Sequence, residues 1–197
     1  MKQIKTHHKN GKLRAHYYEL NGKIHGENKW WHTNGELHIH TYYVKGKIHG
    51  EHKSWYNNGE PYIHTHYVNG KIHGEYKWWH PNGQLHVHTY YENGQDHGDY
   101  KRWYDSGQLF LHAHYVNGNL YGEHKSWHAN GQLHLHTYYV NGEFHGEHKE
   151  YHEDGQLNEH TFWVHNREVT EQVNKLVTDI NHITQEERTL IKLAVGC

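Results

Sequence analysis

Polar and nonpolar side chains alternate along short stretches of the chain, and the same kind of stretch returns every 24 residues. Residues 36–43, ELHIHTYY, place aliphatic, threonine and tyrosine side chains in strict alternation with histidine and tyrosine. A period of two is typical of a β-strand with two different faces. Residues 27–32 are rich in β-favouring aromatic residues and end at Thr33-Asn34-Gly35, a turn sequence. Each unit therefore predicts a β-hairpin.

The glycines mark the repeat most clearly. Three series at a spacing of 24 residues, which include Gly22, Gly26 and Gly35, account for all the glycines except Gly196. A fixed period in this range is typical of supersecondary units stacked in one direction. We expect an all-β repeat array over residues 1–169, in which about seven antiparallel hairpins form one elongated, twisted sheet. At about 4.8 Å per strand, fourteen strands would span roughly 65 Å.

The first turn of the unit favours a three-residue loop. Pro81 takes the first loop position in one unit and Ser106 the second in another, and Ser106 would resist the positive φ of a type I′ turn. A type I turn followed by glycine in the left-handed conformation fits both residues. We expect this register to place Trp31 on the face of Ile39, and His32 on the opposite face.

The second turn, Val44-Lys45-Gly46, is interpreted as a three-residue loop as well. That loop would pair Tyr43 with Lys47 and place His40 beside Gly50 and His38 beside His52. Gly50 would then leave room for the imidazole of His40.

Residues 170–197 break the 24-residue pattern and predict a short α-helical cap or tail. Their apolar residues follow helical spacing, and Thr184 with Glu187 reads as a capping box. An amphipathic tail of this kind could cap the array or pair with a second copy, so we expect a homodimer as one outcome. The predicted assembly residues are Val173, Leu176, Val177, Ile180, Ile183, Leu190 and Ile191.

Composition narrows the function. Only 34% of residues are hydrophobic and mean hydropathy is −1.18, yet 28 residues are histidine. Lys+Arg at 20 nearly balance Asp+Glu at 22, which disfavours nucleic acid as a partner and does not support acidic lipid at pH 7. There is no apolar run near 18 residues, no apolar signal core at the N-terminus, and one cysteine. We expect a cytoplasmic protein.

The recurring string N-G-K-x-H-G-E-x-K-x-W-x-x-N-G-x-L carries a family resemblance. It resembles the MORN repeat, in the variant of a bacterial antitoxin-like family whose units read roughly NGKxHGEWKxYYxNGxL. The match runs through residues 69–85 and recurs six or seven times over residues 2–169. The resemblance implies a hairpin array used for protein interaction, oligomerisation or phospholipid association, with no catalytic residues. Expanded arrays of this kind also occur in giant viruses of amoebae, which implies host cytoplasm or virion as a location.

Histidine is where the chain departs from the family pattern. Seven histidines occupy one repeat position: His16, His40, His64, His88, His112, His136 and His160. Five His-x-His pairs lie in the second strands, where residues i and i+2 point the same way and could reach one Zn, Cu or Ni ion. The expected register completes two trios, which are the metal candidates: His38, His40 and His52; His134, His136 and His148. The alternatives are plain stacking, with no cofactor, and a pH response below about pH 6.

The Glu-x-Lys-x-Trp series is interpreted as a cross-strand ion-pair ladder beside an aromatic paving of Trp31, Trp55, Trp79, Trp103 and Trp127. The chain contains no nucleophile elbow, phosphate-binding loop or zinc-protease motif, and we expect no enzyme activity. The sequence favours a structural or protein-interaction module, a scaffold or assembly protein whose partner it does not identify. Metal or pH response and peripheral lipid or antitoxin-like partner binding are the alternatives.

Overall fold

The computed structural model describes residues 1–172 and 175, and its strands run from Lys2 to Val169. All seventeen strands belong to one antiparallel sheet, as predicted. The strands are β1 (Lys2–His7), β2 (Leu13–Leu20), β3 (Lys23–Trp31), β4 (Leu37–Val44), β5 (Lys47–Trp55), β6 (Pro61–Val68), β7 (Lys71–Trp79), β8 (Leu85–Glu92), β9 (Gln95–Asp96), β10 (Gly98–Trp103), β11 (Leu109–Val116), β12 (Asn119–Leu120), β13 (Gly122–Trp127), β14 (Leu133–Val140), β15 (Glu143–Tyr151), β16 (Leu157–Val164) and β17 (Arg167–Val169).

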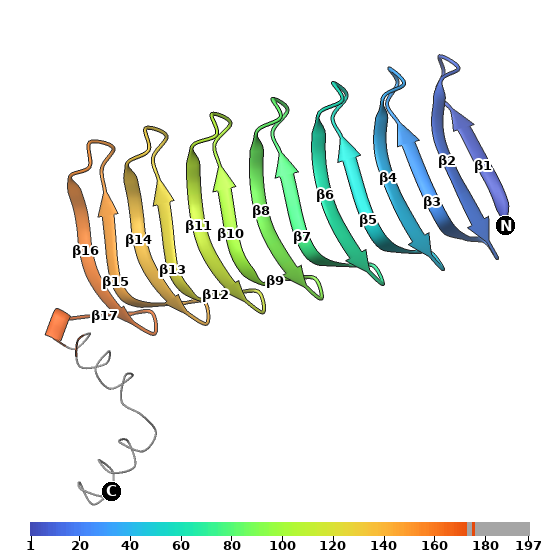
Figure 1. Ribbon diagram of the computed structural model, residues 1–197. Coiled ribbons are helices and arrows are strands. Elements are labelled where there is room, and N and C mark those ends of the chain that lie inside the picture. Colours follow the sequence, from blue (N-terminus) through green and yellow to red (C-terminus); the bar gives the residue numbers. More distant parts are fainter. Residues whose placement is uncertain (173–174, 176–197) are drawn as a thin grey trace, which may run out of the picture.

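Each hairpin pairs with the next one along the chain, so the sheet is a row of hairpins with β1 at one end and β16 and β17 at the other (Figure 1). The strands are visibly bent, and the sheet stays open rather than closing on itself. Two of the expected strands are interrupted by one residue, at His97 and at Tyr121. The amide N–H groups of both residues still donate to carbonyls of the neighbouring strand, at 2.8 and 2.9 Å.

The three-residue first turn is confirmed. The Gly35 N–H donates to the His32 carbonyl at 2.9 Å, the His32 N–H donates to the Glu36 carbonyl at 2.9 Å, and Gly35 has φ +94°. The register beyond this turn was predicted wrongly, because a bulge follows it. Trp31 pairs with Leu37 as expected, but Trp30 then pairs with Ile39. One extra residue in β4 reverses the alternation, so Trp30, not Trp31, shares a face with Ile39.

The second turn is two residues long, which corrects the expected three. Val44 pairs with Lys47 and Tyr43 with Ile48, leaving Lys45 and Gly46 as the loop. Both loop residues have positive φ, +52° and +82°, as a type I′ turn requires. Asparagine tolerates this conformation, which explains why the turn so often reads Asn-Gly. Five other units have asparagine at the Lys45 position: Asn21, Asn69, Asn93, Asn117 and Asn141.

Gly50 has a different role from the one predicted. His40 pairs with Lys53 and not with Gly50, and a Cβ at Gly50 would meet nothing within 4 Å. The backbone needs glycine there because φ is +91°, at a register shift between β4 and β5. The shift bends the strand, since an irregularity of this kind increases local twist and curvature.

The most buried side chains are small. Thr41, Thr89 and Thr137 are the largest that are fully buried, and each pairs with a larger side chain on an adjacent strand. Thr89, for example, pairs with Tyr76 of β7. We call the side of the sheet that carries Trp30, Ile39 and Thr41 the packed face. Its thin core alternates threonine or alanine with tyrosine, histidine or asparagine across the strands.

All seven predicted assembly residues, and all of the predicted helical tail except residues 170–172 and 175, lie outside the described residues. Within the described part of the chain, no helix has the length and apolar character needed to cross a membrane.

Candidate interaction face

The side of the sheet opposite the packed face carries the same group of three charged or titratable side chains in every full repeat. We call it the charged face. In the first full repeat the Glu27 carboxylate accepts from Lys29 Nζ at 2.7 Å, on the same strand, and from His40 Nε2 at 3.0 Å, on the next strand. Because a carboxylate only accepts, Nε2 of His40 carries the hydrogen. The equivalent trios are Glu51, Lys53 and His64; Glu75, Lys77 and His88; Asp99, Lys101 and His112; Glu123, Lys125 and His136; and Glu147, Lys149 and His160.

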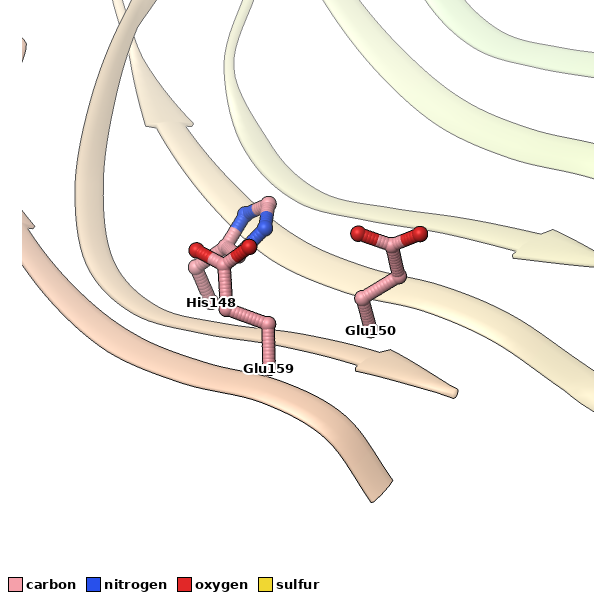
Figure 2. A group of neighbouring side chains, drawn as sticks. All are labelled: His148, Glu150 and Glu159. Carbon is pink, nitrogen blue, oxygen red and sulfur yellow. The ribbon is translucent and has the colours of Figure 1, made fainter. Parts of the chain in front are cut away.

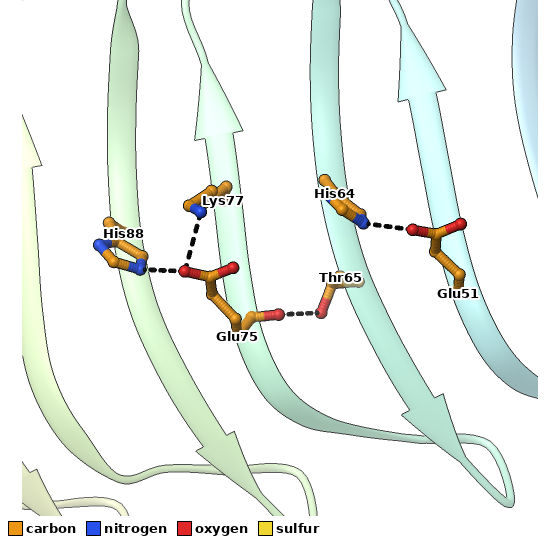
Figure 3. A network of polar contacts seen from close by, with 6 residues as sticks. All are labelled: Glu51, His64, Thr65, Glu75, Lys77 and His88. Atoms are coloured by element: carbon orange, nitrogen blue, oxygen red, sulfur yellow. Dashed lines mark hydrogen bonds and ion pairs between the residues drawn. The ribbon is translucent and has the colours of Figure 1, made fainter.

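Figure 3 shows one of these trios, with the Glu75 carboxylate reached by Lys77 and by His88, beside the Glu51–His64 pair of the preceding repeat. The ion pairs were expected between strands, but the Glu–Lys contact runs along one strand and histidine makes the cross-strand contact. The hydrogen bond from Lys77 is the main reason that the pKa of Glu75 lies below its usual value, and His88 adds to the effect. The carboxylate is therefore ionised at neutral pH and balances the lysine charge.

Lysine and histidine form one continuous row across the charged face. His40 pairs with Lys29 on one side and with Lys53 on the other, and the same alternation continues to His160. Of the seven repeat-face histidines, six contact a carboxylate of this kind. The seventh, His16, contacts the Gln3 side chain amide at 2.7 Å. These histidines are thus placed on one face, each tied to a partner on the neighbouring strand.

The aromatic paving lies on the charged face, because Trp31, Trp55 and their equivalents alternate with their neighbours in the strand and share the side of the lysines. All five paving tryptophans are half-buried. An open groove of about 370 Å³ lies between Trp55 and Trp79, and Lys53, Pro61 and His64 contribute to its lining. Apolar and charged groups therefore meet in one depression of this face.

The structure does not bring the predicted metal trios together. His38 stacks on His32 with ring centroids 4.1 Å apart, whereas His40 contacts Glu27 on the charged face. The bulge in β4 separates them, since it falls between His38 and His40. His52 pairs with Thr41 on the packed face. The other trio divides in the same way, with His134 and His148 on the packed face and His136 on the charged face.

Both rims of the sheet hold hydrogen bonds that the sequence analysis missed. At the first turn, Asn34 accepts from the Glu36 N–H with its side chain oxygen and donates to the Asn57 carbonyl of the next turn, at 3.0 and 2.6 Å. Four further asparagines donate in the same way: Asn10, Asn58, Asn82 and Asn130. At the other rim, the Gly46 N–H donates to the Ile24 carbonyl at 2.9 Å. The fixed recurrence of Asn-Gly was the available signal.

A second set of rim contacts comes from the residue before the first turn. His32 Nε2 donates to the Trp55 carbonyl at 2.9 Å, and Tyr56 Oη donates to the Trp79 carbonyl at 2.7 Å. Histidine and tyrosine thus substitute for one another at this position, because each offers a flat ring with one donor at its tip. Part of the histidine content is explained by this structural role.

An open row of hairpins in which each unit contacts only its neighbours defines a solenoid-like β-repeat protein. The profile of the MORN repeat variant matches six successive segments of this chain: residues 24–45, 48–69, 72–93, 96–117, 120–141 and 144–165. The chain belongs to the MORN repeat family. MORN repeats are generally non-enzymatic modules for interaction with proteins or membranes. A comparison with curated proteins found no match to the chain.

Proposed function

We propose that this chain is a non-enzymatic interaction scaffold that binds a protein partner over its charged face. The observation that carries the proposal is the open charged face itself, which presents the same acid, lysine, histidine and tryptophan set at each repeat. A repeated surface of this kind suits an elongated or multivalent partner, because identical contacts recur with the spacing of the hairpins.

The groove between Trp55 and Trp79 supports a protein partner. Protein interfaces are enriched in aromatic anchors surrounded by polar groups, and the groove joins two tryptophans and a proline with a lysine and a histidine. It fits an aliphatic or aromatic side chain with a neighbouring polar or acidic group.

Charge pairing favours protein over acidic lipid. The lysine Nζ atoms of five trios lie 2.6–2.8 Å from a carboxylate, so these cations are already neutralised on the face that would meet a phosphate surface. Membrane binding through clustered basic residues gains about 1 kcal/mol for each free lysine or arginine. Peripheral lipid association and an antitoxin-like partner are retained as the alternatives to be tested.

The test compares one variant pair in a partner screen. Trp55→Ala with Trp79→Ala removes the walls of the groove, and His80→Gln at the rim serves as the matched control. The wild type and the two variants are each expressed in cells and cross-linked to their partners. The partners are then identified, and their affinities are measured with purified components. A partner that binds the wild type and the control, and binds the tryptophan variant at least about tenfold more weakly, supports the proposal. Equal binding by all three proteins contradicts it.

Vesicle sedimentation tests the lipid alternative. At pH 7.5 we expect equal, low binding to phosphatidylcholine vesicles with and without about 30% phosphatidylserine or about 5% phosphoinositide. Binding that depends on the anionic lipid would replace the protein partner by a membrane surface.

Self-association through residues 170–197 is the second part of the proposed assembly role. Light scattering on the full chain and on a chain ending at residue 169 distinguishes the two roles of the tail. A dimer that becomes a monomer on truncation assigns assembly to the tail and leaves the charged face for a partner. If both the full chain and the truncated chain are monomers, the tail acts only as a cap on its own array and does not mediate assembly.

A further inference from the structure

The last hairpin of the array departs from all the others at two positions that face each other. In the five preceding full repeats an aliphatic residue of the second strand pairs with tryptophan, serine or arginine of the first. In the last repeat Glu150 of β15 pairs with Glu159 of β16. The corresponding pairs are Trp30 with Ile39, Ser54 with Ile63, Trp78 with Val87, Arg102 with Leu111 and Ser126 with Leu135. Both members of the pair have become carboxylates together.

Two directly opposed carboxylates on neighbouring strands repel each other and destabilise the sheet. Nothing in the repeat requires acidic residues here, since the same backbone accepts Ser126 opposite Leu135 one unit earlier. A bound cation between the two carboxylates would convert the repulsion into attraction. A bound cation therefore explains why both residues of this pair are glutamate in the last repeat.

A histidine completes the arrangement. His148 precedes Glu150 by two residues on β15, and one ligand atom from each of His148, Glu150 and Glu159 lies within 4.8 Å of the other two. Figure 2 shows the imidazole and both carboxylates turned toward a common space beside β15 and β16. The Nδ1 atom of His148 is buried without a hydrogen-bond partner, so no protein group competes for that nitrogen.

A second histidine lies beside this group. His134 Nε2 is 3.6 Å from a carboxylate oxygen of Glu150, and His134 comes from the neighbouring strand β14. Three adjacent strands therefore supply two imidazoles and two carboxylates. Within the described residues, no other group of three such side chains is this close.

We propose that His148, Glu150 and Glu159 bind one divalent transition-metal ion, with His134 in position to serve as the fourth ligand. Mixed imidazole and carboxylate ligands suit Zn²⁺ and its neighbours in the first transition row, whereas Mg²⁺ and Ca²⁺ prefer oxygen alone. The site is on the packed face, so it is separate from the proposed partner surface and does not depend on it.

Outer contacts hold one of the ligands. The Thr161 hydroxyl donates to a Glu159 oxygen at 3.2 Å, and Trp163 Nε1 donates to the Thr161 hydroxyl at 2.9 Å. Such contacts orient a carboxylate toward a metal. Trp163 belongs to the last hairpin alone, because the equivalent position holds tyrosine in the five repeats before it.

The experiment measures Zn²⁺ binding by calorimetry, using the full chain without an affinity tag after treatment with EDTA. Since the chain has many histidines, the decisive quantity is a difference between variants. Glu150→Ser with Glu159→Leu restores the residues of the preceding repeat. We expect the wild type to bind one equivalent tightly, and this double variant to lose that equivalent while its metal-free melting temperature stays equal or rises. The preserved melting temperature separates loss of the site from loss of the fold.

Two single variants check the ligand set. His134→Gln should weaken the tight equivalent about tenfold or more, whereas His136→Gln, two residues away on the other face, should leave it unchanged. Co²⁺ in place of Zn²⁺ reports the coordination through its visible absorption. The proposal is overturned if the wild type has no tight equivalent, if the double variant keeps it, or if His136→Gln removes it.

Discussion

Two buried threonines at the same repeat position differ in one hydrogen bond, and that difference predicts opposite effects of the same substitution. Thr41 and Thr65 are 2% and 3% exposed. The Thr41 hydroxyl is buried without a partner, whereas the Thr65 hydroxyl donates to the Glu75 carbonyl at 3.1 Å, as Figure 3 shows. Valine keeps the branched shape of threonine and replaces the hydroxyl by a methyl group.

The magnitudes follow from the cost of burying a polar group. Thr41→Val removes an unpaired buried hydroxyl and should raise the free energy of unfolding by about 1 kcal/mol. Thr65→Val removes a hydrogen bond and leaves a buried carbonyl with one partner fewer, which should lower it by about 1 kcal/mol. The expected separation between the two variants is therefore about 2 kcal/mol, well above the few tenths typical of neutral substitutions.

Urea unfolding monitored by circular dichroism measures this difference, and the repeat position supplies the control. Both variants change the same residue type at the same depth in the sheet, so β-propensity and apolar burial cancel between them. Thr89→Val, where the hydroxyl donates to Asp96 at 3.4 Å, should behave like Thr65→Val with a smaller loss. Equal unfolding midpoints for the Thr41 and Thr65 variants would refute the argument from hydrogen bonding.

Three further predictions concern the turns, the bulges and pH. Lys45→Asn should stabilise the protein by about 1 kcal/mol, because Lys45 has φ +52° where asparagine is tolerated, and Asn69→Lys should cost a similar amount in thermal unfolding. Gly50→Ala should cost about 1–3 kcal/mol in urea unfolding although space is free, because φ is +91°; a neutral result would contradict backbone strain. Burial lowers the pKa of His52 and His124, so the unfolded chain takes up protons first as pH falls. Their stabilising contribution is complete above about pH 6.5 and declines below it. The melting temperature should therefore fall between pH 7.5 and 5.5, and an unchanged value would rule this out.

The hairpin array could be predicted from the sequence because several local signals agree. The 24-residue period, the alternation in residues 36–43 and the loop chemistry around Gly35 all point to the same unit, and the structure has it. The register was less predictable. A bulge adds one residue to a strand without a clear signal in the alternation of polar and apolar residues. Trp31 was therefore predicted to lie on the face that Trp30 occupies. The loop at Lys45 was interpreted as three residues, although five other units carry Asn-Gly there, the usual signal of a two-residue type I′ turn.

The candidate surfaces were predictable to different degrees. The seven repeat-face histidines share one face, as their spacing indicated, but their carboxylate partners depend on the cross-strand register. His38 and His40, and likewise His134 and His136, failed as common ligands because a bulge lies between them. Glu150 and Glu159 were not predicted as a site, because neither residue belongs to a recurring position pattern. An alignment of the units against one another would have marked both residues as exceptions.

The hydrogen bonds along the two rims fix the increments in which the length of this molecule can change. Each turn is fastened to the next by the Asn34-type side chain at one rim, except where Ser106 replaces asparagine, and by the Gly46-type amide at the other. Adding or removing one complete 24-residue unit preserves every one of these contacts and changes the length by two strand spacings, about 9.6 Å. Inserting a single residue would break both fastenings and reverse one strand's faces. The reach of the protein can therefore change only in whole steps, and a partner that grips two distant units would detect each step as a change in distance.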